Sequence, residues 1–273
     1  MVMGEAKRRK SRSDDAALGW PENLRKLHAA EEDLRLRGLG MVKGDEDLTR
    51  QIRLIETVMD FLQRYLNTHE TTDPDEITVQ HLGVRVFNAA AAALKLALGG
   101  YGQVSAGILR DILETTFLVD SFRTDRSRIA EWRNITEDKR GQAFGADAVR
   151  RYLDVRDKYT ERRRRQAYMD LCRMGTHPTV QGFALLRAGD TGTPPGPFLA
   201  SNILAATINE LAKLMVEVGE TFEAFLPNDG PSAIEAKTLL MEETGRWLER
   251  YYGVPYDEGP VREVRGLLTK LRA

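Results

Sequence analysis

The chain has 273 residues, of which 42% are hydrophobic and 30% are charged, so it contains enough apolar material for a substantial core. Its 40 lysines and arginines nearly balance its 41 aspartates and glutamates, which excludes recognition of a nucleic acid or a membrane through net charge alone. The single cysteine, Cys172, excludes an internal disulfide framework and suits a reducing compartment.

Residues 1–17 are basic and lack a helical apolar pattern, so we expect a disordered or weakly helical tail. No apolar segment of the secretory type follows it. The longest uninterrupted apolar run, residues 89–94, is far shorter than the roughly 18 residues that span a membrane. We therefore expect a cytoplasmic protein with no membrane partner.

Two helices are predicted next. Apolar residues at helical spacing mark residues 21–37, and Gly38 and Gly40 are expected to end this segment. A stronger apolar stripe covers residues 46–69, with Asp45 as the N-cap. Each helix has only one apolar face, so each needs neighbours to bury it.

The third predicted helix has a distinct start. Asp73 is expected to be its N-cap, with Pro74 at the first helical position and Glu76 closing a capping box. The helix is expected to end at residues 99–100, which are both glycine. Its five consecutive alanines, residues 89–93, predict a surface that a neighbouring helix approaches closely.

The stretch at residues 101–125 is apolar on nearly every side, which predicts a helix in the middle of the fold. One narrow polar strip interrupts this pattern, and it carries Arg110 and Glu114. Four residues apart on a helix, these two side chains can form an ion pair. An exposed pair contributes only about 0.3–0.5 kcal/mol. Removing one partner of a buried pair costs roughly 3–5 kcal/mol.

A helix is predicted from residue 127 to near Gly141, and a long one from 146 to 174. Between residues 150 and 165 the second helix has eight basic and three acidic residues, which makes it a candidate nucleic-acid-binding surface. At least one arginine of the run 162–165 should face inward or lie across a neighbouring helix, because the run covers the whole helical circumference. The candidate binding residues are Arg150, Arg151, Arg162, Arg163, Arg164 and Arg165.

His177 is expected on a turn that ends the long helix, because Pro178 disfavours helical conformation in the residue before it. A short hairpin or ordered loop is predicted near residues 183–200. Further helices are predicted at 201–225, at 231–251 and from 260 onward. Together these segments predict an all-α fold, a single bundle of about eight helices in one domain at 18–273.

Sequence motifs for common chemistries are missing. The chain has no phosphate-binding glycine loop, no His-Glu-x-x-His zinc helix and no Gly-x-Ser-x-Gly elbow. We therefore expect no metal and no cofactor. The residues that could support chemistry are the Arg110–Glu114 pair and His177, whose unperturbed pKa near 6.5 suits a general acid or base.

The run LGGYGQVSAGILRDILETTFLVDSFRTD, followed by EWRN, MGTHPTVQGF and GPFL, resembles a family of uncharacterised bacterial helical proteins. That family has an Arg-x-x-x-Glu helix and a turn histidine, and it is similar to HEPN domains, many of which are RNases of toxin and defence systems. The resemblance implies a metal-independent endoribonuclease with Arg110, Glu114, His177 and Arg173 as catalytic residues. Three residues separate Arg173 from His177, whereas HEPN RNases have a longer spacing.

Two alternatives stand beside this interpretation. The first is a non-catalytic helical interaction module in which Arg110, Glu114 and His177 form a buried structural cluster. The second is an RNA-binding protein that uses the arginines between 150 and 165 without cleaving RNA. The expected partners are RNA and an antitoxin or other protein. A homodimer is expected under each hypothesis, since alanine-rich and central helices often pack across a two-fold axis.

Overall fold

A computed structural model of the chain describes residues 19–187, 192–227 and 230–272. These residues form helices and connecting turns without any β-strand, which confirms the all-α prediction. The described part contains eleven α-helices rather than about eight. The predicted tail at residues 1–17 lies outside the described residues.

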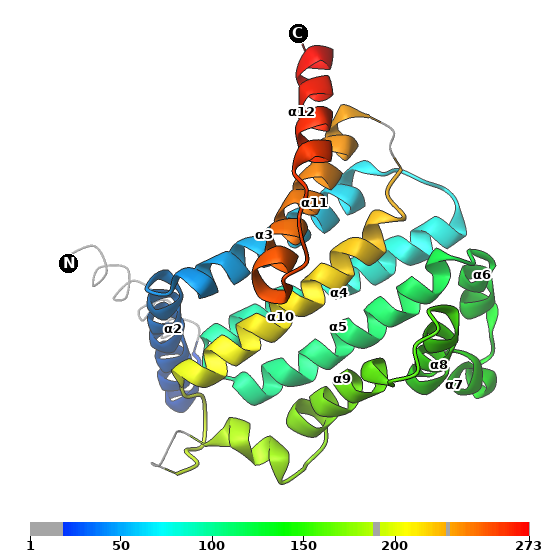
Figure 1. The fold of residues 1–273 in the computed structure, drawn as a ribbon. Helices are drawn as coiled ribbons and strands as arrows, with labels where there is room; N and C mark the ends of the chain where they lie inside the picture. Colours follow the sequence, from blue (N-terminus) through cyan, green and yellow to red (C-terminus); the bar gives the residue numbers. More distant parts are fainter. Residues whose placement is uncertain (1–18, 188–191, 228–229, 273) are drawn as a thin grey trace.

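Four long helices form the centre of the fold: α3 (Glu46–Thr68), α4 (Pro74–Leu98), α5 (Gly102–Arg123) and α10 (Ser201–Glu223). Helix α5 packs against both α4 and α10, and α10 packs against α3 (Figure 1). The predicted position of residues 101–125 in the middle of the fold is therefore confirmed. Although α5 has neighbours on several sides, its charged residues Asp111, Glu114 and Arg123 remain 38–40% exposed.

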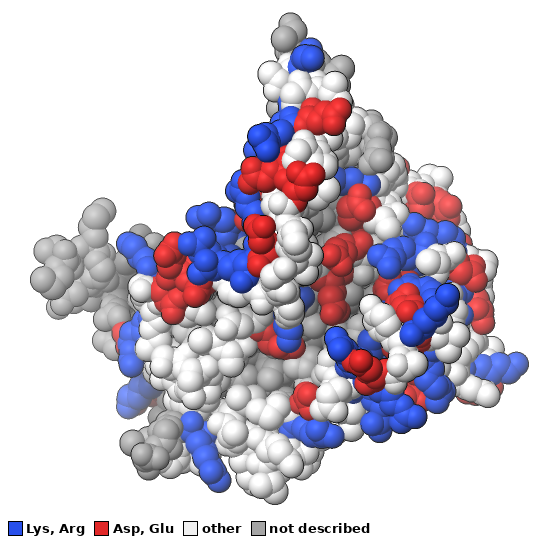
Figure 2. Space-filling model, in the orientation of Figure 1, with Lys and Arg blue, Asp and Glu red and all other residues white. Residues whose placement is uncertain are grey.

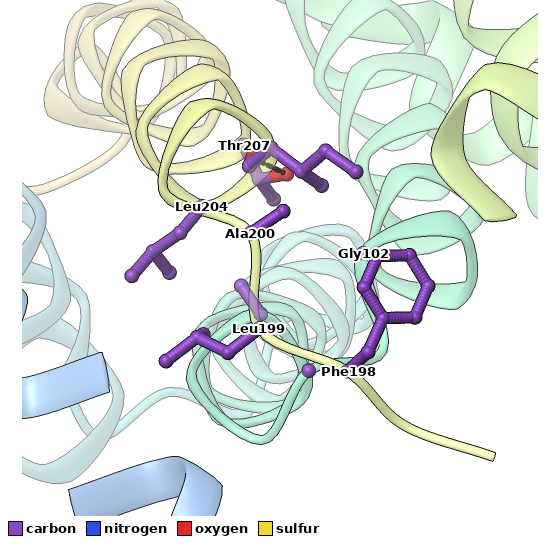
Figure 3. Close-up of a pocket in the computed structure, with 9 residues that line it drawn as sticks. Gly102, Phe198, Leu199, Ala200, Leu204 and Thr207 are labelled. Carbon is purple, nitrogen blue, oxygen red and sulfur yellow. Dashed lines mark hydrogen bonds between the residues drawn. The ribbon is translucent and has the colours of Figure 1, made fainter. Parts of the chain in front are cut away.

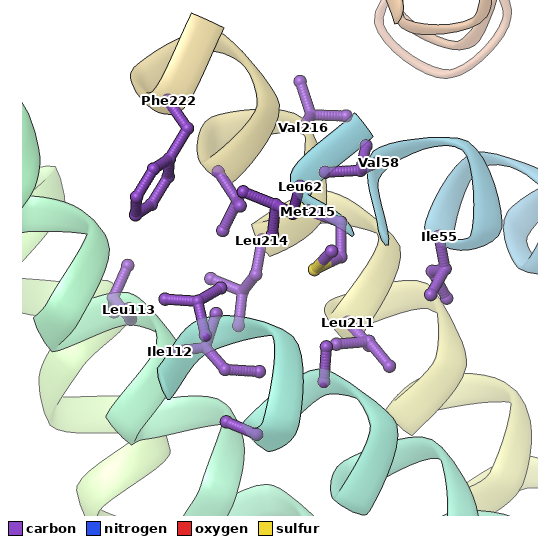
Figure 4. Close-up of a cluster of buried hydrophobic side chains, with 14 of the residues drawn as sticks. Ile55, Val58, Leu62, Ile112, Leu113, Leu211, Leu214, Met215, Val216 and Phe222 are labelled. Atoms are coloured by element: carbon purple, nitrogen blue, oxygen red, sulfur yellow. The ribbon is translucent and has the colours of Figure 1, made fainter. Parts of the chain in front are cut away.

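Apolar side chains from α3, α5 and α10 meet in one buried cluster (Figure 4). Its members include Ile55, Val58, Leu62, Ile112, Leu113, Leu211, Leu214, Met215, Val216 and Phe222. Each buried Leu, Ile or Phe side chain contributes roughly 1.5–3 kcal/mol through removal of apolar surface from water. The alanines of α4 allow α5 to lie close, and the Ser105 hydroxyl donates to the Ala93 carbonyl oxygen at 2.8 Å.

Two helix starts are confirmed. The Asp45 carboxylate accepts from the Leu48 backbone N–H at 3.0 Å, and the Asp73 carboxylate accepts from the Asp75 N–H at 2.8 Å. The predicted capping box is not formed by Glu76, whose carboxylate lies 3.2 Å from the His69 imidazole nitrogen Nε2. That hydrogen bond instead joins the end of α3 to the start of α4.

Helix α2 (Glu22–Lys43) continues through Gly38 and Gly40, so the prediction that these glycines end it is wrong. At Gly38 the helix touches the C-terminal end of α4. A Cβ atom there would lie 2.9 Å from the Leu98 carbonyl oxygen. Gly38 therefore serves a close helix–helix contact rather than a helix end.

The helix predicted from residue 127 is also interrupted, because α6 (Ser127–Asn134) ends before α7 (Glu137–Phe144) begins. The backbone between them is extended at Ile135 and Thr136. Together with the start of α8, these short helices gather at one end of α5 (Figure 1).

The long helix predicted at 146–174 is broken into two helices and a π-helical turn. Helix α8 (Ala146–Arg156) is followed by α9 (Arg163–Leu171) and then by the π-helix at Cys172–Thr176. Lys158 and Arg162 have φ angles of 57° and 51°, which an uninterrupted right-handed helix does not allow. The break lets α8 and α9 each pack against α5.

The hairpin predicted near 183–200 is absent from the described residues there, whereas residues 188–191 lie outside the described part. A 3-10 helix covers Gln181–Leu186 instead. The Phe198 N–H donates to the Gly100 carbonyl oxygen at 3.1 Å, which anchors the segment that leads into α10. This contact borders a cavity of only about 10 Å³, enough for one water molecule (Figure 3).

The predicted C-terminal helices are present as α11 (Pro231–Tyr252) and α12 (Gly259–Arg272). Helix α12 packs on α11 and extends away from the central helices (Figure 1). Among the described helices, α4 has the length and mean hydropathy, 1.2, of a membrane span. Helix α4 is packed against α3, α5 and α10, as a core helix of the fold would be.

Candidate anion-binding site

A cavity of about 410 Å³ lies along α5, between α4 on one side and the segment from α6 to α9 on the other. This volume falls within the range of about 300–1,000 Å³ that is usual for small-molecule sites. The charged and phenolic side chains that line it are Arg85, Arg110, Asp111, Glu114, Arg150 and Tyr168.

The predicted pair of Arg110 and Glu114 forms part of this lining. One guanidinium nitrogen of Arg110 lies 2.7 Å from a carboxylate oxygen of Glu114, and the two side chains are 28% and 39% exposed. The Tyr168 phenol oxygen accepts hydrogen bonds from Arg110 Nε at 3.2 Å and from Nη2 at 2.6 Å. Burial alone lowers the pKa of Arg110, but the Tyr168 oxygen and the Glu114 charge outweigh it and raise the pKa above its usual value. Arg110 therefore stays protonated.

Arg150 lies on the opposite wall of the cavity and is 6% exposed. Its guanidinium group stacks over the Tyr168 ring, 4.0 Å from the ring centre. The contact between its Nη2 and the Asp147 carboxylate is long, at 3.5 Å. Its Nε and Nη1 atoms are buried and have no hydrogen-bond partner among the described residues. Arg150 is therefore a buried cation beside the cavity whose Nε and Nη1 are covered by the surrounding protein and whose Nη2 has only the long contact with Asp147.

Arg85 and Asp111 form an ion pair across α4 and α5, with side chains 58% and 38% exposed. They are the more solvent-exposed part of the lining. Arg150 is compensated only by its long contact with Asp147, which lies outside the lining, so the lining itself carries one excess positive charge. The cavity therefore attracts a negatively charged group.

His177 and Arg173 are exposed and are not among the residues that line the cavity. Within the described part of the chain, no hydrogen bond or ion pair joins His177 to Arg110 or Glu114. The backbone N–H of His177 donates to the Cys172 carbonyl oxygen at 2.8 Å, and the Arg173 side chain pairs with Asp170 at 3.1 Å. The expectation that these residues form one reactive group with Arg110 is not met in this conformation.

The path of the chain along α5 explains this separation. Tyr168 contacts Arg110, but the π-helix then runs toward the N-terminal end of α5, where the Gln103 side-chain amide donates to the Gly175 carbonyl oxygen at 2.6 Å. Gly175 itself lies against the Gly107 backbone, so the π-helix ends about one helical turn from Arg110. His177 follows two residues later with an exposed side chain outside the cavity lining.

The π-helix touches α5 backbone to backbone. A Cβ atom on Gly175 would lie 2.2 Å from the Gly107 backbone nitrogen. Only glycine fits at this contact without moving one of the two elements. The contact fixes the distance between α9 and α5, and so it fixes Tyr168 beside Arg110.

The arginines between 150 and 165 do not form a uniform basic surface, because most of them pair with nearby carboxylates. Arg151 lies 2.5 Å from Asp147, and Arg163 lies 2.6 Å from Glu161. Basic and acidic side chains alternate over α8 and α9 (Figure 2). Arg162 and Arg165 are exposed, whereas Arg150 is buried in the cavity wall.

Arg164 is the inward-facing member of the run 162–165, as the helical geometry predicted. Its side chain is 15% exposed and pairs with Asp154 at 3.0 Å and with Asp157. Arg156 contacts Asp157 at 2.7 Å and Asp120 of α5 at 2.7 Å. These five residues form a paired network that joins α5, α8 and α9.

Sequence reasoning missed the roles of Tyr168 and Arg85 and treated Arg150 as a surface residue. One signal could have identified Arg150: it lies on the buried face of its helix, between Val149 and Leu153, which are 3% and 0% exposed. An arginine on an apolar face needs a buried partner or a ligand. Nothing in the sequence places Tyr168 beside α5, because that contact depends on the break after α8.

No group of three or more His, Cys, Asp or Glu side chains in the described ranges is arranged to hold a metal ion. No protein-family model, curated protein or solved structure matches this chain. The fold and the cavity define an all-α protein with an arginine-lined cavity that is open to solvent.

Proposed function

We propose that this protein binds an anionic ligand in the cavity along α5, with the charged group of the ligand held between Arg110 and Arg150. The observation that carries this proposal is the state of Arg150, which is buried and has two N–H donor atoms without partners. Buried donor atoms without acceptors carry a desolvation cost that is not recovered within the fold. A carboxylate or phosphate oxygen in the cavity would supply the missing acceptors.

The neighbouring groups support the same proposal. The Tyr168 ring lies under the Arg150 guanidinium group, and its hydroxyl accepts from Arg110. Two cations are thus held around one side chain, and Glu114 compensates only one of them. An anion that enters this space would meet preorganised donors, so little side-chain entropy would be lost on binding.

Thermal unfolding with inorganic phosphate, at constant ionic strength, tests the proposal. A ligand that binds only the folded state raises the unfolding temperature with its concentration. The wild-type protein and an Arg151→Gln variant should both gain stability, because Arg151 is an exposed neighbour outside the cavity lining. Arg150→Gln should gain none. An equal gain in the Arg150→Gln and Arg151→Gln variants would contradict the proposal.

A ribonuclease is a second candidate, favoured by the resemblance to HEPN-like proteins and by the presence of Arg110, Glu114 and Tyr168 in one cavity. The ribose 2′-hydroxyl would attack the adjacent phosphorus and lose its proton to Glu114. The bond from phosphorus to the 5′-oxygen would break, and that oxygen would take up a proton. Arg110 and Arg150 would stabilise the added negative charge on the phosphate. The products would be a 2′,3′-cyclic phosphate and a 5′-hydroxyl.

Incubation of the purified protein with total RNA tests this second candidate, with Glu114→Gln and His177→Ala as parallel variants. Cleavage lost in Glu114→Gln and kept in His177→Ala would support catalysis in the cavity. Cleavage lost in His177→Ala alone would support the turn histidine as the acid or base instead. Absence of cleavage by the folded wild-type protein would leave anion binding without chemistry.

The remaining expectations are also proposals. RNA binding through the surface of α8 and α9 has weak support, because most of those arginines are paired. A homodimer, a protein partner such as an antitoxin and a cytoplasmic location follow only from the sequence. Light scattering on the purified protein would measure the oligomeric state, and a monomer would rule out the homodimer.

A further inference from the structure

The cavity along α5 is charged at one end and apolar at the other. Arg110 and Glu114 lie at the charged end, whereas Leu118, two turns later on the same helix, lies at the apolar end. Arg110 and Leu118 are eight residues apart, which corresponds to about 12 Å along the helix axis. A ligand that fills the cavity therefore meets two different environments.

The aromatic lining confirms where the apolar end lies. Trp132 and Phe144 line the cavity, and both rings also pack on Phe122, near the C-terminal end of α5. Their ring centres lie 6.4 and 6.5 Å from that of Phe122. This end of the lining is formed mainly by hydrocarbon, so it would not satisfy a polar or charged ligand group.

The net charge of the cavity lining limits how many negative charges the ligand carries. Three arginines and two carboxylates line the cavity, so the lining carries one net positive charge. Arg150, whose contact with the Asp147 carboxylate is long at 3.5 Å, matches one negative charge, and Glu114 and Asp111 would repel a second. A singly charged carboxylate fits this balance better than a doubly charged phosphate ester.

We infer that the ligand is a small amphipathic carboxylate, with its charged group between Arg110 and Arg150 and its aromatic or alkyl body toward Leu118 and Trp132. This inference rests on the proposed anion-binding function and adds the chemical class of the ligand. Burial of the body in the apolar end contributes affinity through the hydrophobic effect, at about fourfold for each buried methylene group.

Binding constants for acetate, hexanoate and 3-phenylpropionate, measured by ligand-observed NMR on the intact protein, test the inference. Affinity should rise at least tenfold from acetate to 3-phenylpropionate, and Arg150→Gln should weaken binding of all three acids. The uncharged alcohol 3-phenylpropanol should bind at least tenfold more weakly than 3-phenylpropionate. Equal binding of the alcohol and the acid would contradict recognition of the charge.

A second variant tests the apolar end alone. Leu118→Trp should fill this end and abolish the gain from acetate to 3-phenylpropionate while acetate binding is kept. Val104→Trp is the matched control, because Val104 lies on the same helix but is 47% exposed outside the cavity lining. Circular dichroism and the unfolding midpoint of each variant verify that it folds.

The outcomes separate the inference from the proposed function. Equal affinity for all three acids, lost in Arg150→Gln, would keep the anion site and overturn the amphipathic ligand. Failure of both the acids and inorganic phosphate to bind would overturn both. A rise in affinity that survives Leu118→Trp would show that the apolar body binds elsewhere, which also overturns the inference.

Discussion

Arg150 in the cavity and Arg156 at the end of the same helix, α8, differ in what surrounds their guanidinium groups. Arg156 contacts the carboxylates of Asp120 and Asp157, each at 2.7 Å. Arg150 has two buried nitrogens without partners and stacks on Tyr168. The difference between these two residues shows that burial of an arginine does not by itself identify its role. The presence or absence of an acceptor within the fold separates a structural cation from one that is free to bind a ligand.

The largest effect on stability is expected for Arg156, the arginine that pairs with carboxylates. Arg156→Met would leave the largely buried Asp120 carboxylate without its main partner. Breaking such a pair costs about 3 kcal/mol of unfolding free energy. Urea denaturation would measure this loss. Arg151→Met is the control, because its exposed pair with Asp147 contributes less than about 1 kcal/mol. Equal stability of the two variants would show that the network does not hold α8 on α5.

Low pH should weaken the ion-pair network of Arg156, Asp157 and Arg164. The hydrogen bond from Arg156, followed by that from Arg164, lowers the pKa of Asp157 below its usual value despite partial burial. The stabilisation is therefore present above the unfolded-state pKa of about 3.9 and is lost as pH falls through the lower folded-state value. Unfolding midpoints below pH 4 should drop less in Asp157→Asn than in the wild type. An equal decrease of the unfolding midpoint with pH in the wild type and in Asp157→Asn would contradict a contribution from Asp157.

A smaller effect on stability is expected for Arg150, which has no close carboxylate partner. Arg150→Met removes a buried charge that has no close acceptor, so the unfolding free energy should change by less than about 1 kcal/mol. The lost cation–π contact with Tyr168 offsets part of the gain. Urea denaturation beside Arg156→Met makes the comparison direct. A loss as large as that of Arg156→Met would mean that Arg150 is a structural residue.

The smallest effect is expected at Glu217 of α10, which faces Arg164 of the network. Desolvation of the carboxyl group, with the nearby charges of Glu220 and Glu210, raises the pKa of Glu217 to about 7, but the residue is exposed at the surface, so only a small effect on stability is expected. A raised carboxyl pKa favours folding below the unfolded-state value of about 4.3, and this contribution is lost as pH rises through 7.

Glu217→Gln should therefore raise the thermal unfolding midpoint at pH 8 and leave it nearly unchanged at pH 4. Glu223→Gln, on the same helix, is the control, because Glu223 pairs with Lys237 at 2.9 Å and is not one of the charges that raise the pKa of Glu217. The same midpoint shift at both pH values in Glu217→Gln would rule out titration as the cause.

The candidate site could be predicted only in part. The pairing of Arg110 with Glu114 follows from their spacing on one helix, and the central position of α5 follows from its apolar circumference. The contact between Arg110 and Tyr168 could not be predicted from the sequence, because α9 turns back onto α5 only after the left-handed residues Lys158 and Arg162. The turn position of His177 was predicted correctly, but its separation from Arg110 could not be predicted for the same reason.

The sequence by itself determined the local features of this protein: the all-α class, the caps at Asp45 and Asp73, and the apolar stripes of the long helices. These depend on residues within a few positions of each other, so short-range spacing is enough to predict them. The tertiary structure alone decided which arginines are paired and which one lines a cavity. That outcome depends on contacts between helices distant along the chain, and helical periodicity carries no information about which helices meet.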